Sequence, residues 1–597
     1  MSQLSLSVNE LRTNTQQWEA LKTEGHCVVL APPGSGKTKL LTTRVAVDLA
    51  NKIARPQGAA CVTMTNPAAG ELQDRLTAFD LGHRHSLFIG TVHRFVLTRI
   101  VLPFATFVGR PELHDMSIAG DAESKGALAE AMGMAGMPSG QSREAKSARE
   151  NMKSTVTLHR KRLSTPDEWA QLAPLAVDVN RRYENLLHNR GLFDFDELIS
   201  LGVDFVESHP QIRRVLNAQY PRIYVDEYQD LAPGLDRLVK SLCFDHSTGS
   251  ELFAVGDPDQ SVYAFAGSRP ELLVELAGRS DVTPIHLRRN YRSGQEIVRV
   301  AQKVKHSDSP VDAGREGGIV TATECPDGFL QQCTRCVQLI QEMQQRGIRL
   351  HEIAVLCPAN EQCLTVTAEL RRVGVPAFFR NTEDYRHATS TAFIEGCAAW
   401  ACAGRETSNY RLGYLLRQWR LMCGSAHSRE LDAALTELLM SYQDLDGEPA
   451  SAFLEDLLTA GLGNALARPS LGEDAVQVAA MHAALTTGSL QGLTIADLAV
   501  RSLKTDRVEV ITMTSSKGLE FDVVALLGVD QGRLPFWSSV EGTEGLAEDR
   551  RKFYVSLTRA RDEVHIFYSG FVEWASGFIA RNGPSQLLTE IGVLQPS

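Results

Sequence analysis

Residues 27–44 of this chain read CVVLAPPGSGKTKLLTTR, and they decide the kind of fold that the rest of the chain must build. The apolar run Cys27–Leu30 suits a buried parallel strand, and an amphipathic run begins at Lys39. Gly34 and Gly36 lie between them and allow backbone N–H groups to turn toward phosphate oxygens at a helix start. A strand, a glycine-rich loop and a helix in this order predict a phosphate-binding loop.

Two side chains at the end of this loop carry the chemistry. Lys37 can reach the β- and γ-phosphates of a nucleotide, and Thr38 can place its hydroxyl on Mg²⁺. The loop departs from the usual G-x-x-x-x-G-K-[ST] pattern because Ala31 stands at the first glycine. A Gly-Ser turn between a strand and a helix is the alternative, but such a turn would not require Lys-Thr at these positions.

Composition sets limits on the other properties of the protein. The chain has 597 residues, which is enough for about three or four domains. A net charge of -11 argues against a chain-wide polyanion binder but leaves room for a local basic groove. The 11 scattered cysteines suit a reducing compartment. We expect no signal peptide, no membrane span and a cytoplasmic location.

The distribution of strand-like runs predicts the organisation. Such runs alternate with helical ones near the N-terminus, which is typical of a parallel sheet flanked by helices. Two stretches lack strand signals and are rich in helix-forming residues. We therefore expect an α/β protein of two parallel-sheet lobes, each with a mostly helical insertion. The predicted ranges are 1–100 and 190–285 for the first lobe, 101–189 for its insertion, 286–380 and 505–597 for the second lobe, and 381–504 for a reduced second insertion.

Acidic and amide side chains follow two further strands. Arg222–Asp226 is a strand that delivers Asp226 and Glu227 at its carboxyl end, beside the phosphate loop of a parallel sheet. Asp226 can hold Mg²⁺, and Glu227 can polarise the attacking water. Gln260 follows the strand Leu252–Gly256 and is placed to sense the γ-phosphate. A solvated acidic turn is the alternative for the two carboxylates.

Arginines and aromatic residues complete the set. An Arg from a neighbouring lobe can neutralise charge on a transferring phosphoryl group when the lobes close, and Arg292 and Arg559 are the candidates. A surface salt bridge is the alternative for Arg559. Tyr263 and Phe265 are either core residues or platforms on which bases stack. Residues 142–162 hold seven Lys/Arg against two Glu, which favours a solvated helix face and leaves contact with a phosphate backbone open.

Nine segments, in order, resemble the motifs of superfamily 1A DNA helicases, the UvrD/Rep/PcrA type. In that family the alanine at position 31 is expected. The nine segments are Asn14–Ala20 (NTQQWEA), Ala31–Thr38 (APPGSGKT), Thr63–Leu72 (TMTNPAAGEL), Gly90–His93 (GTVH), Val225–Asp230 (VDEYQD), Val255–Ser268 (VGDPDQSVYAFAGS), Leu287–Ser293 (LRRNYRS), Thr512–Phe521 (TMTSSKGLEF) and Glu548–Ala560 (EDRRKFYVSLTRA).

The resemblance implies a fold of two RecA-like lobes and an ATP-dependent helicase or translocase that moves 3′→5′ on single-stranded DNA, including 3′-tailed duplexes. It implies a catalytic set of Lys37, Asp226, Glu227, Gln260, Arg292 and Arg559, with Mg²⁺ on Thr38 and Asp226. ATP would contact Gln17, Ala31, Pro32, Pro33, Gly34, Ser35, Gly36, Lys37, Thr38, Lys39, Tyr291, Gly518 and Glu520. A single-strand groove would include Asn66, His93, Phe195, Tyr263, Phe265 and Thr514.

The departures from the family pattern lie mostly on the DNA side. Met64 replaces a pocket Phe, Pro67 replaces Lys, Phe265 replaces Trp, and Thr514 replaces a DNA-contacting His. We therefore expect a weakened groove beside an intact ATPase site. Two alternatives stay open: a DNA-stimulated ATPase that strips proteins from DNA or regulates a nuclease, and a nucleotide-gated structural subunit. By analogy with UvrD-like helicases of repair, recombination and phage defence, a partner nuclease is a further hypothesis.

Overall fold

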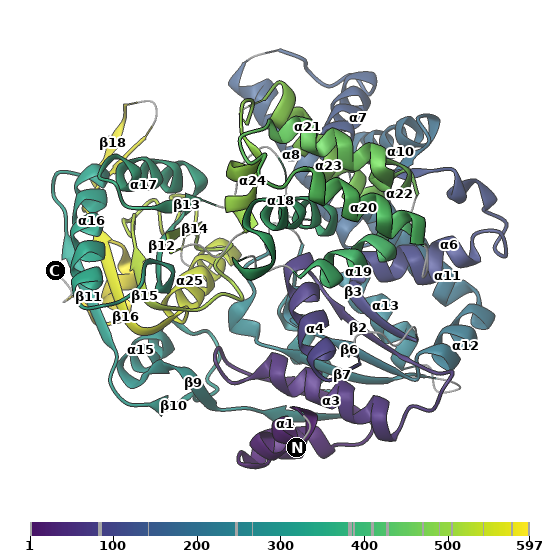
Figure 1. Ribbon diagram of the computed structural model, residues 1–597, viewed down its shortest axis with the longest axis horizontal. Coiled ribbons are helices and arrows are strands. Elements are labelled where there is room, and N and C mark those ends of the chain that lie inside the picture. The colour runs from purple at the N-terminus through teal and green to yellow at the C-terminus, as the bar shows by residue number, and fades with distance from the viewer. Residues whose placement is uncertain are drawn as a thin grey trace.

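The structure is a computed structural model of the 597-residue chain. It describes residues 3–81, 86–140, 142–172, 174–244, 249–264, 267–379, 385, 388–407, 411–424, 429–468, 471–488, 490–502, 506–540, 542–574 and 577–594. Two sheets lie apart in Figure 1, with the first below two groups of helices and the second at the left. Among the described residues no helix is long and apolar enough to cross a membrane.

The first sheet has six parallel strands in the order β3-β2-β6-β7-β1-β8. Alternate residues of β1 face opposite sides: Val28 packs in one core, and Cys27 and Val29 pack in the other. The carboxyl ends of β6, β7 and β1 are neighbours, so the loops that follow them meet at one edge. The strands are β1 (His26–Leu30), β2 (Ala59–Thr63), β3 (Leu87–Thr91), β6 (Arg222–Val225), β7 (Glu251–Gly256) and β8 (Val282–His286).

Helices cover both faces of this sheet. One core holds residues of the first four helices, and the other holds residues of the later helices. The first four are α1 (Gln3–Arg12), α2 (Thr15–Lys22), α3 (Lys37–Asn51) and α4 (Asn66–Ala78). The later ones are α5 (Val92–Phe95), α11 (Phe195–Ser208), α12 (Pro210–Gln219), α13 (Pro233–Cys243) and α14 (Glu271–Ala277).

Between α5 and α11 the chain is mainly helical. A π-helical turn, Val96–Val101, leads into it, and Ala127, Val156, Val179 and Leu187 belong to a separate small core. Two short strands, β4 (Ser117–Ile118) and β5 (Leu192–Phe193), pair in parallel. The helices are α6 (Leu102–Phe104), α7 (Asp121–Met134), α8 (Arg143–Lys161), α9 (Pro166–Ala170) and α10 (Pro174–Asn189).

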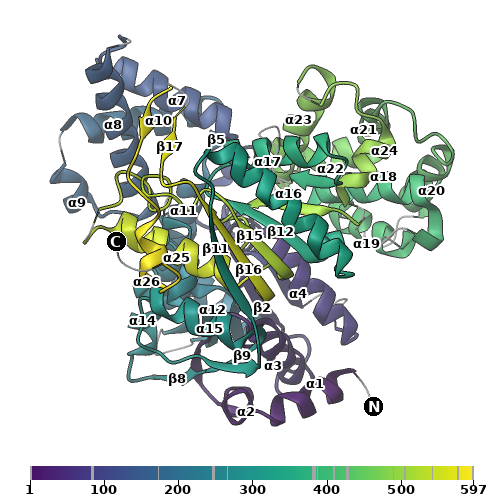
Figure 2. The ribbon, with the colours of Figure 1, turned by 90° about the vertical axis from the view of Figure 1, so that its left-hand side faces the viewer.

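The second sheet is also parallel, in the order β11-β16-β15-β12-β14-β13, and crosses the centre of Figure 2. Its two faces carry separate cores. The strands are β11 (Ile319–Glu324), β12 (Ile353–Cys357), β13 (Ala377–Phe379), β14 (Val508–Thr512), β15 (Phe521–Leu526) and β16 (Ala560–Tyr568). Its helices are α15 (Gln295–Ala301), α16 (Phe329–Gln345), α17 (Asn360–Arg372), α25 (Glu544–Leu557) and α26 (Gln586–Glu590).

A second helical group interrupts this lobe between β13 and β14. Its core includes Trp400 and Trp419, both fully buried, and is separate from the sheet cores. In Figure 2 this group lies at the upper right, whereas α7, α8 and α10 lie at the upper left. Its helices are α18 (Thr389–Thr407), α19 (Leu412–Cys423), α20 (Arg429–Ser441), α21 (Ala450–Leu457), α22 (Gly463–Leu466), α23 (Gly472–Thr486) and α24 (Ile495–Ser502), with a π-helical turn Leu458–Leu462.

Three short pairs of strands were not expected from the sequence, the pair β4–β5 of the helical insertion and two more. β9 (Arg289–Gly294) pairs in parallel with β10 (Asp312–Arg315), and β17 (Val572–Glu573) pairs antiparallel with β18 (Ile579–Ala580). The segment Leu287–Ser293 is polar, so it lacks the apolar alternation that predicts a strand. Its extended form depends on contacts with the first lobe, because Tyr291 N–H donates to Gly34 C=O at 2.8 Å.

Candidate active site and nucleic-acid interface

The phosphate loop joins β1 to α3. Gly34 and Gly36 have φ of 69° and 81°, a left-handed region in which a side chain would be strained. Gly36 is the N-cap of α3, and Lys37 is the first helical residue. A Cβ added at Gly34 would lie 2.6 Å from Asn290 Oδ1 and 2.8 Å from Arg292 Cβ. Both glycines are therefore required by geometry, and the loop touches the second lobe directly.

A cavity of about 800 Å³ opens at this loop and is lined by both lobes. A volume of this size is within the range of small-molecule and cofactor sites. It brings together most of the predicted ATP-site residues. Those that line it are Pro33, Gly34, Ser35, Gly36, Lys37, Thr38, Lys39, Asp226, Glu227, Gln260, Tyr291, Arg292, Gly518, Glu520 and Arg559. Ala31 and Pro32 instead line a smaller cavity of about 290 Å³.

The ammonium of Lys37 is buried in the cavity wall. Its Nζ has no hydrogen-bond partner among the residues that the structure describes, and Glu227 Oε1 lies 3.6 Å away. A buried ammonium without hydrogen bonds is costly. The oxygens of a nucleotide phosphate would satisfy it, so this position fits ATP.

The two carboxylates at the end of β6 have opposite electrostatic environments. Burial and the neighbouring charge of Glu227 raise the pKa of Asp226, whose Oδ1 accepts the Glu227 N–H at 3.1 Å. Burial alone would raise the pKa of Glu227 too, but Lys37 and Lys517 outweigh it and lower that pKa. Glu227 also has a positive φ of 53°, which is rare outside glycine. Asp226 thus fits a cation ligand, and Glu227 is an ionised carboxylate beside the phosphate loop.

Two arginines from outside the first lobe face this site. Arg292 Nε donates to Glu520 Oε2 at 2.9 Å, and Arg559 Nε donates to Val555 C=O at 3.0 Å. Burial, reinforced by the positive charge of Arg292, lowers the pKa of Arg559 to about 9. An anion in the cavity would relieve the repulsion between these two guanidinium groups, as a phosphoryl group does.

Sequence reasoning missed Lys517 of the second lobe, which lines the same cavity. Its Nζ donates to Asp230 Oδ2 at 2.6 Å and to Gln260 C=O at 2.8 Å, and it lies 3.4 Å from Glu227 Oε2. Burial opposes its charge, but Asp230 and Glu227 raise the pKa of Lys517 above its ordinary value. Lys517 could have been predicted from its position in the segment Thr512–Phe521, where it follows a strand and directly precedes Gly518.

Gln260 stands on a short loop, residues 257–261, after β7. Its Nε2 donates to Asp257 Oδ2 at 2.7 Å, and both residues are buried. Burial and the nearby Asp259 raise the pKa of Asp257 to about 6. Asp257 N–H donates to Gln229 Oε1 at 3.0 Å, which connects this loop to the turn that carries Glu227.

The residues expected around adenine lie at the other end of the phosphate loop. Gln17 Nε2 donates to Ser35 C=O at 2.8 Å, so its amide lies against the loop. Asn14 caps α2 and also donates from Nδ2 to the Tyr291 hydroxyl at 2.9 Å. The ring of Tyr291 is 41 % exposed and is available to stack on a base.

The residues predicted to bind single-stranded DNA lie in different surroundings in the structure. The rings of His93 and Phe195 meet edge to face at 5.4 Å, and burial lowers the pKa of His93 to about 4. Asn66 begins α4 and is half-buried. Tyr263 lines the nucleotide cavity, 5.6 Å from Lys517 Nζ. Thr514 is half-buried in the turn after β14, and Phe265 lies outside the described residues.

Arg160 belongs to the basic run of α8, but its side chain is buried and bonded to other protein residues. It is 7 % exposed; Nη2 donates to Asp194 Oδ1 at 2.7 Å, and Nη1 donates to Asn180 Oδ1 at 3.0 Å. Tyr183 O–H donates to the other Asp194 oxygen at 2.7 Å. Asp194 in turn caps α11, whose first residue is Phe195. At this position the basic run anchors the helical insertion next to the Phe195 ring.

Comparisons with known proteins agree with this geometry. Residues 13–280 match the UvrD/REP helicase N-terminal domain, and residues 426–570 match the UvrD-like helicase C-terminal domain. The chain belongs to the UvrD/Rep helicase family. Its members include the ATP-dependent DNA helicase Rep of Escherichia coli, 24 % identical over 97 % of this chain and 94 % of that protein.

Two other UvrD/Rep helicases show the same extent of similarity. DNA helicase II of Haemophilus influenzae is 25 % identical over 91 % of this chain and 82 % of its own length. The ATP-dependent DNA helicase PcrA of Staphylococcus aureus is 24 % identical over 97 % and 86 %. This UvrD/Rep family member is therefore an α/β, ATP-hydrolysing DNA helicase with RecA-like lobes.

Proposed function

We propose that this helicase moves 3′→5′ along single-stranded DNA and opens 3′-tailed duplexes, and that hydrolysis of Mg²⁺-ATP drives this movement. The observation that carries the proposal is the shared cavity: the phosphate loop supplies Lys37, and the second lobe supplies Arg292 and Arg559 to the same space. A site completed only by both lobes makes hydrolysis depend on how they sit together. The direction rests on the family resemblance.

The roles within the cavity follow from position and charge. Lys37 and the loop N–H groups bind the phosphates, Glu227 orients and deprotonates the attacking water, and Arg292 and Arg559 neutralise charge on the transferring phosphoryl group. Thr38 and Asp226 are the groups that would hold Mg²⁺, which neutralises phosphate charge when bound. The residues fit both groups, because Lys37 Nζ is buried without a hydrogen bond from any described residue and Asp226 is buried beside Glu227.

The ion pairs of Glu227 bear on its proposed role as the base that activates water. With Lys37 at 3.6 Å and Lys517 at 3.4 Å, Glu227 is a weak base. Phosphates that draw Lys37 away would raise the basicity of this carboxylate as substrate binds. ATP would thus both supply the reacting group and strengthen the base that activates water.

The DNA groove is proposed to cross the first lobe near His93 and Phe195. The rings of His93 and Phe195 pack edge to face and are both half-buried, so they offer an aromatic surface to a base. Bases of single-stranded DNA stack on such surfaces without sequence preference. We also propose the four domains whose ranges are given above, because each helical insertion has a core of its own.

A strand-displacement assay tests the function. A duplex with a 3′ single-stranded tail should be unwound with ATP and Mg²⁺, and a 5′-tailed duplex of the same sequence should not. Unwinding of only the 5′-tailed substrate would contradict the direction. ATPase rates with single strands, duplex, RNA or no nucleic acid should be highest with single-stranded DNA.

A second candidate is a DNA-stimulated ATPase that removes proteins from DNA without efficient unwinding. The substitutions Met64, Pro67 and Thr514 on the DNA side favour it. Displacement of a bound protein from single-stranded DNA, together with stimulated ATPase and no strand separation, would support this candidate. A partner nuclease, by analogy with relatives in repair and phage defence, is tested by co-purification.

A further inference from the structure

Asp259 lies in the loop 257–261 of the first lobe and is 1 % exposed. Its carboxylate accepts hydrogen bonds from the second lobe: His306 N–H at 2.9 Å and Ser307 N–H at 3.0 Å reach Oδ1, and the Ser307 hydroxyl reaches Oδ2 at 2.5 Å. Lys305 Nζ lies 3.7 Å from Oδ2. Three hydrogen bonds end on one buried carboxylate, so this contact holds the segment 305–309 against the loop.

The next two residues of the same loop also contact the second lobe. Gln260 C=O accepts from Lys517 Nζ at 2.8 Å, and Ser261 C=O accepts from Arg551 Nε at 2.8 Å. Three successive residues thus meet three different elements: the segment 305–309, the turn after β14, and α25. Because the Gln260 side chain lines the nucleotide cavity, the loop connects that cavity to all three.

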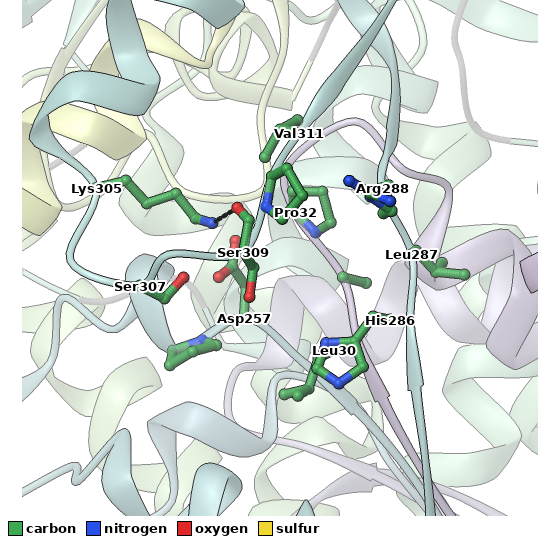
Figure 3. A pocket seen from close by; sticks show the side chains of 13 residues that line it. Leu30, Pro32, Asp257, His286, Leu287, Arg288, Lys305, Ser307, Ser309 and Val311 are labelled. Atoms are coloured by element: carbon green, nitrogen blue, oxygen red, sulfur yellow. Dashed lines mark hydrogen bonds between the residues drawn. The ribbon is translucent and has the colours of Figure 1, made fainter.

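Figure 3 shows the segment 305–309 that Asp259 contacts, next to a cavity. Lys305 Nζ donates to Ser309 C=O, which closes residues 305–309 into a turn. A cavity of about 290 Å³ separates this turn from Leu30 and Pro32 at the end of β1. Among the described residues, the hydrogen bonds that join the turn to the first lobe all end on Asp259.

We infer that Asp259 is a positioning residue that couples the nucleotide-sensing loop to the second lobe through His306 and Ser307. A shift of Gln260 on nucleotide binding moves Asp259 with it, and the three hydrogen bonds carry that shift into the segment after α15 (Gln295–Ala301). The inference rests on the proposed function, because it concerns how strongly ATP turnover and DNA movement depend on each other.

Two variants and one control test the coupling. Ser307→Ala removes one of the three hydrogen bonds, and Asp259→Asn removes the charge and offers an N–H group toward donors. Asp308→Asn alters an exposed neighbour in the same segment. The measurements are ATPase rates with and without single-stranded DNA, unwinding of a 3′-tailed duplex, and hydrogen exchange of the amides of residues 306 and 307.

Ser307→Ala should keep the DNA-independent ATPase rate within about twofold and lower its stimulation by DNA at least threefold. Asp259→Asn should lower the stimulation about tenfold and speed exchange of both amides, while the KM for ATP changes little. Asp308→Asn should behave as wild type. A general loss of structure would lower the ATPase rates with and without DNA together. A loss of coupling would lower only the stimulation of the ATPase rate by DNA.

Wild-type stimulation and unwinding in Ser307→Ala would overturn the inference, and so would wild-type coupling in an Asp259→Asn protein whose amides 306 and 307 exchange faster. If Asp259→Asn fails to fold, Ser307→Ala alone decides. A wild-type protein with no response to DNA would overturn the proposed function, and this inference with it. That result is visible before any variant is made, so the two failures are distinguishable.

Discussion

The ammonium of Lys517 lies 2.6 Å from Asp230 Oδ2, although 287 positions separate these residues in the chain. The contact joins a turn of the second lobe to the acidic turn after β6. It also places a positive charge 3.4 Å from Glu227, the residue proposed to activate water. One second-lobe lysine thus contributes both to the contact between the lobes and to the low pKa of Glu227.

Lys517→Met should shift the pH dependence of ATP hydrolysis. The charges of Lys37 and Lys517 lower the pKa of Glu227 against the effect of burial. Because a base acts only when deprotonated, activity is lost as pH falls through its pKa, and removing Lys517 moves that acidic limit to higher pH. The measurement is kcat for ATP at pH values from about 4 to 9. Lys552→Met on α25 is a matched control, and an unchanged acidic limit in Lys517→Met would count against this role.

Lys37→Ala should abolish ATP hydrolysis while the fold persists. Among the described residues the ammonium has no hydrogen-bond partner, so its removal breaks no hydrogen bond and loses the 3.6 Å ion pair with Glu227. We expect kcat to fall by at least about 100-fold, equivalent to about 2.7 kcal/mol of transition-state stabilisation, with a similar melting temperature. Lys52→Ala, which removes a surface pair with Glu24 just after α3, is the control. Activity near wild type in Lys37→Ala would refute the proposed ATP site.

Tyr291→Ala should raise the KM for ATP about tenfold with little change in kcat, because base stacking contributes about 1–3 kcal/mol. The ring is 41 % exposed, so stability should change little. Tyr291→Phe keeps the ring and loses only the hydrogen bond from Asn14, and it should stay close to wild type. Steady-state kinetics over a range of ATP concentrations separates the two parameters. Equal KM values for the Ala and Phe variants would exclude stacking.

Phe195→Ala should weaken binding of single-stranded DNA by about 1–3 kcal/mol and leave the DNA-independent ATPase rate near wild type. The measurement is fluorescence anisotropy with a labelled oligothymidine, with thermal unfolding as a check on the fold. Phe107→Ala is a suitable control, since that ring is 60 % exposed in the first insertion. If both variants bound DNA equally well, the groove would have to lie elsewhere.

Asp194→Ala should destabilise the protein by about 1–3 kcal/mol, because the buried guanidinium of Arg160 loses one of its two carboxylate partners and keeps Glu184. Arg160→Met in the same background removes that buried charge and should restore part of the loss. Chemical denaturation of the single and double variants measures the effect. The double variant would be no more stable than Asp194→Ala if Arg160 were solvated.

Much of the ATP site could be predicted because its parts are local in the sequence. The phosphate loop and the pair Asp226-Glu227 each follow an apolar strand, and parallel strands present such residues at one edge. Arg292 and Arg559 were also predicted, but only the fold shows that they line one cavity with Lys37. Each sheet likewise follows from its apolar runs.

Other features depend on contacts between distant segments, which no local pattern reveals. Lys517 and Asp259 look like ordinary surface charges in the sequence, yet both are buried between the lobes. β9 is polar, yet it is extended, pairs with β10 and donates one hydrogen bond to the phosphate loop. Arg160 belongs to a basic run that is typical of a solvated helix, and burial against Asp194 overrides that pattern.

The close approach of Asn290 to Gly34 is a second reason why position 34 requires glycine. A methyl group there would collide with the facing strand as well as strain the loop. Substitution at this position should therefore resemble a defect in domain docking more than a defect in nucleotide affinity. In an evolving lineage, changes at residues 34 and 290 would have to be compatible with each other, so the mutational history of a phosphate loop is tied to a residue more than 250 positions away.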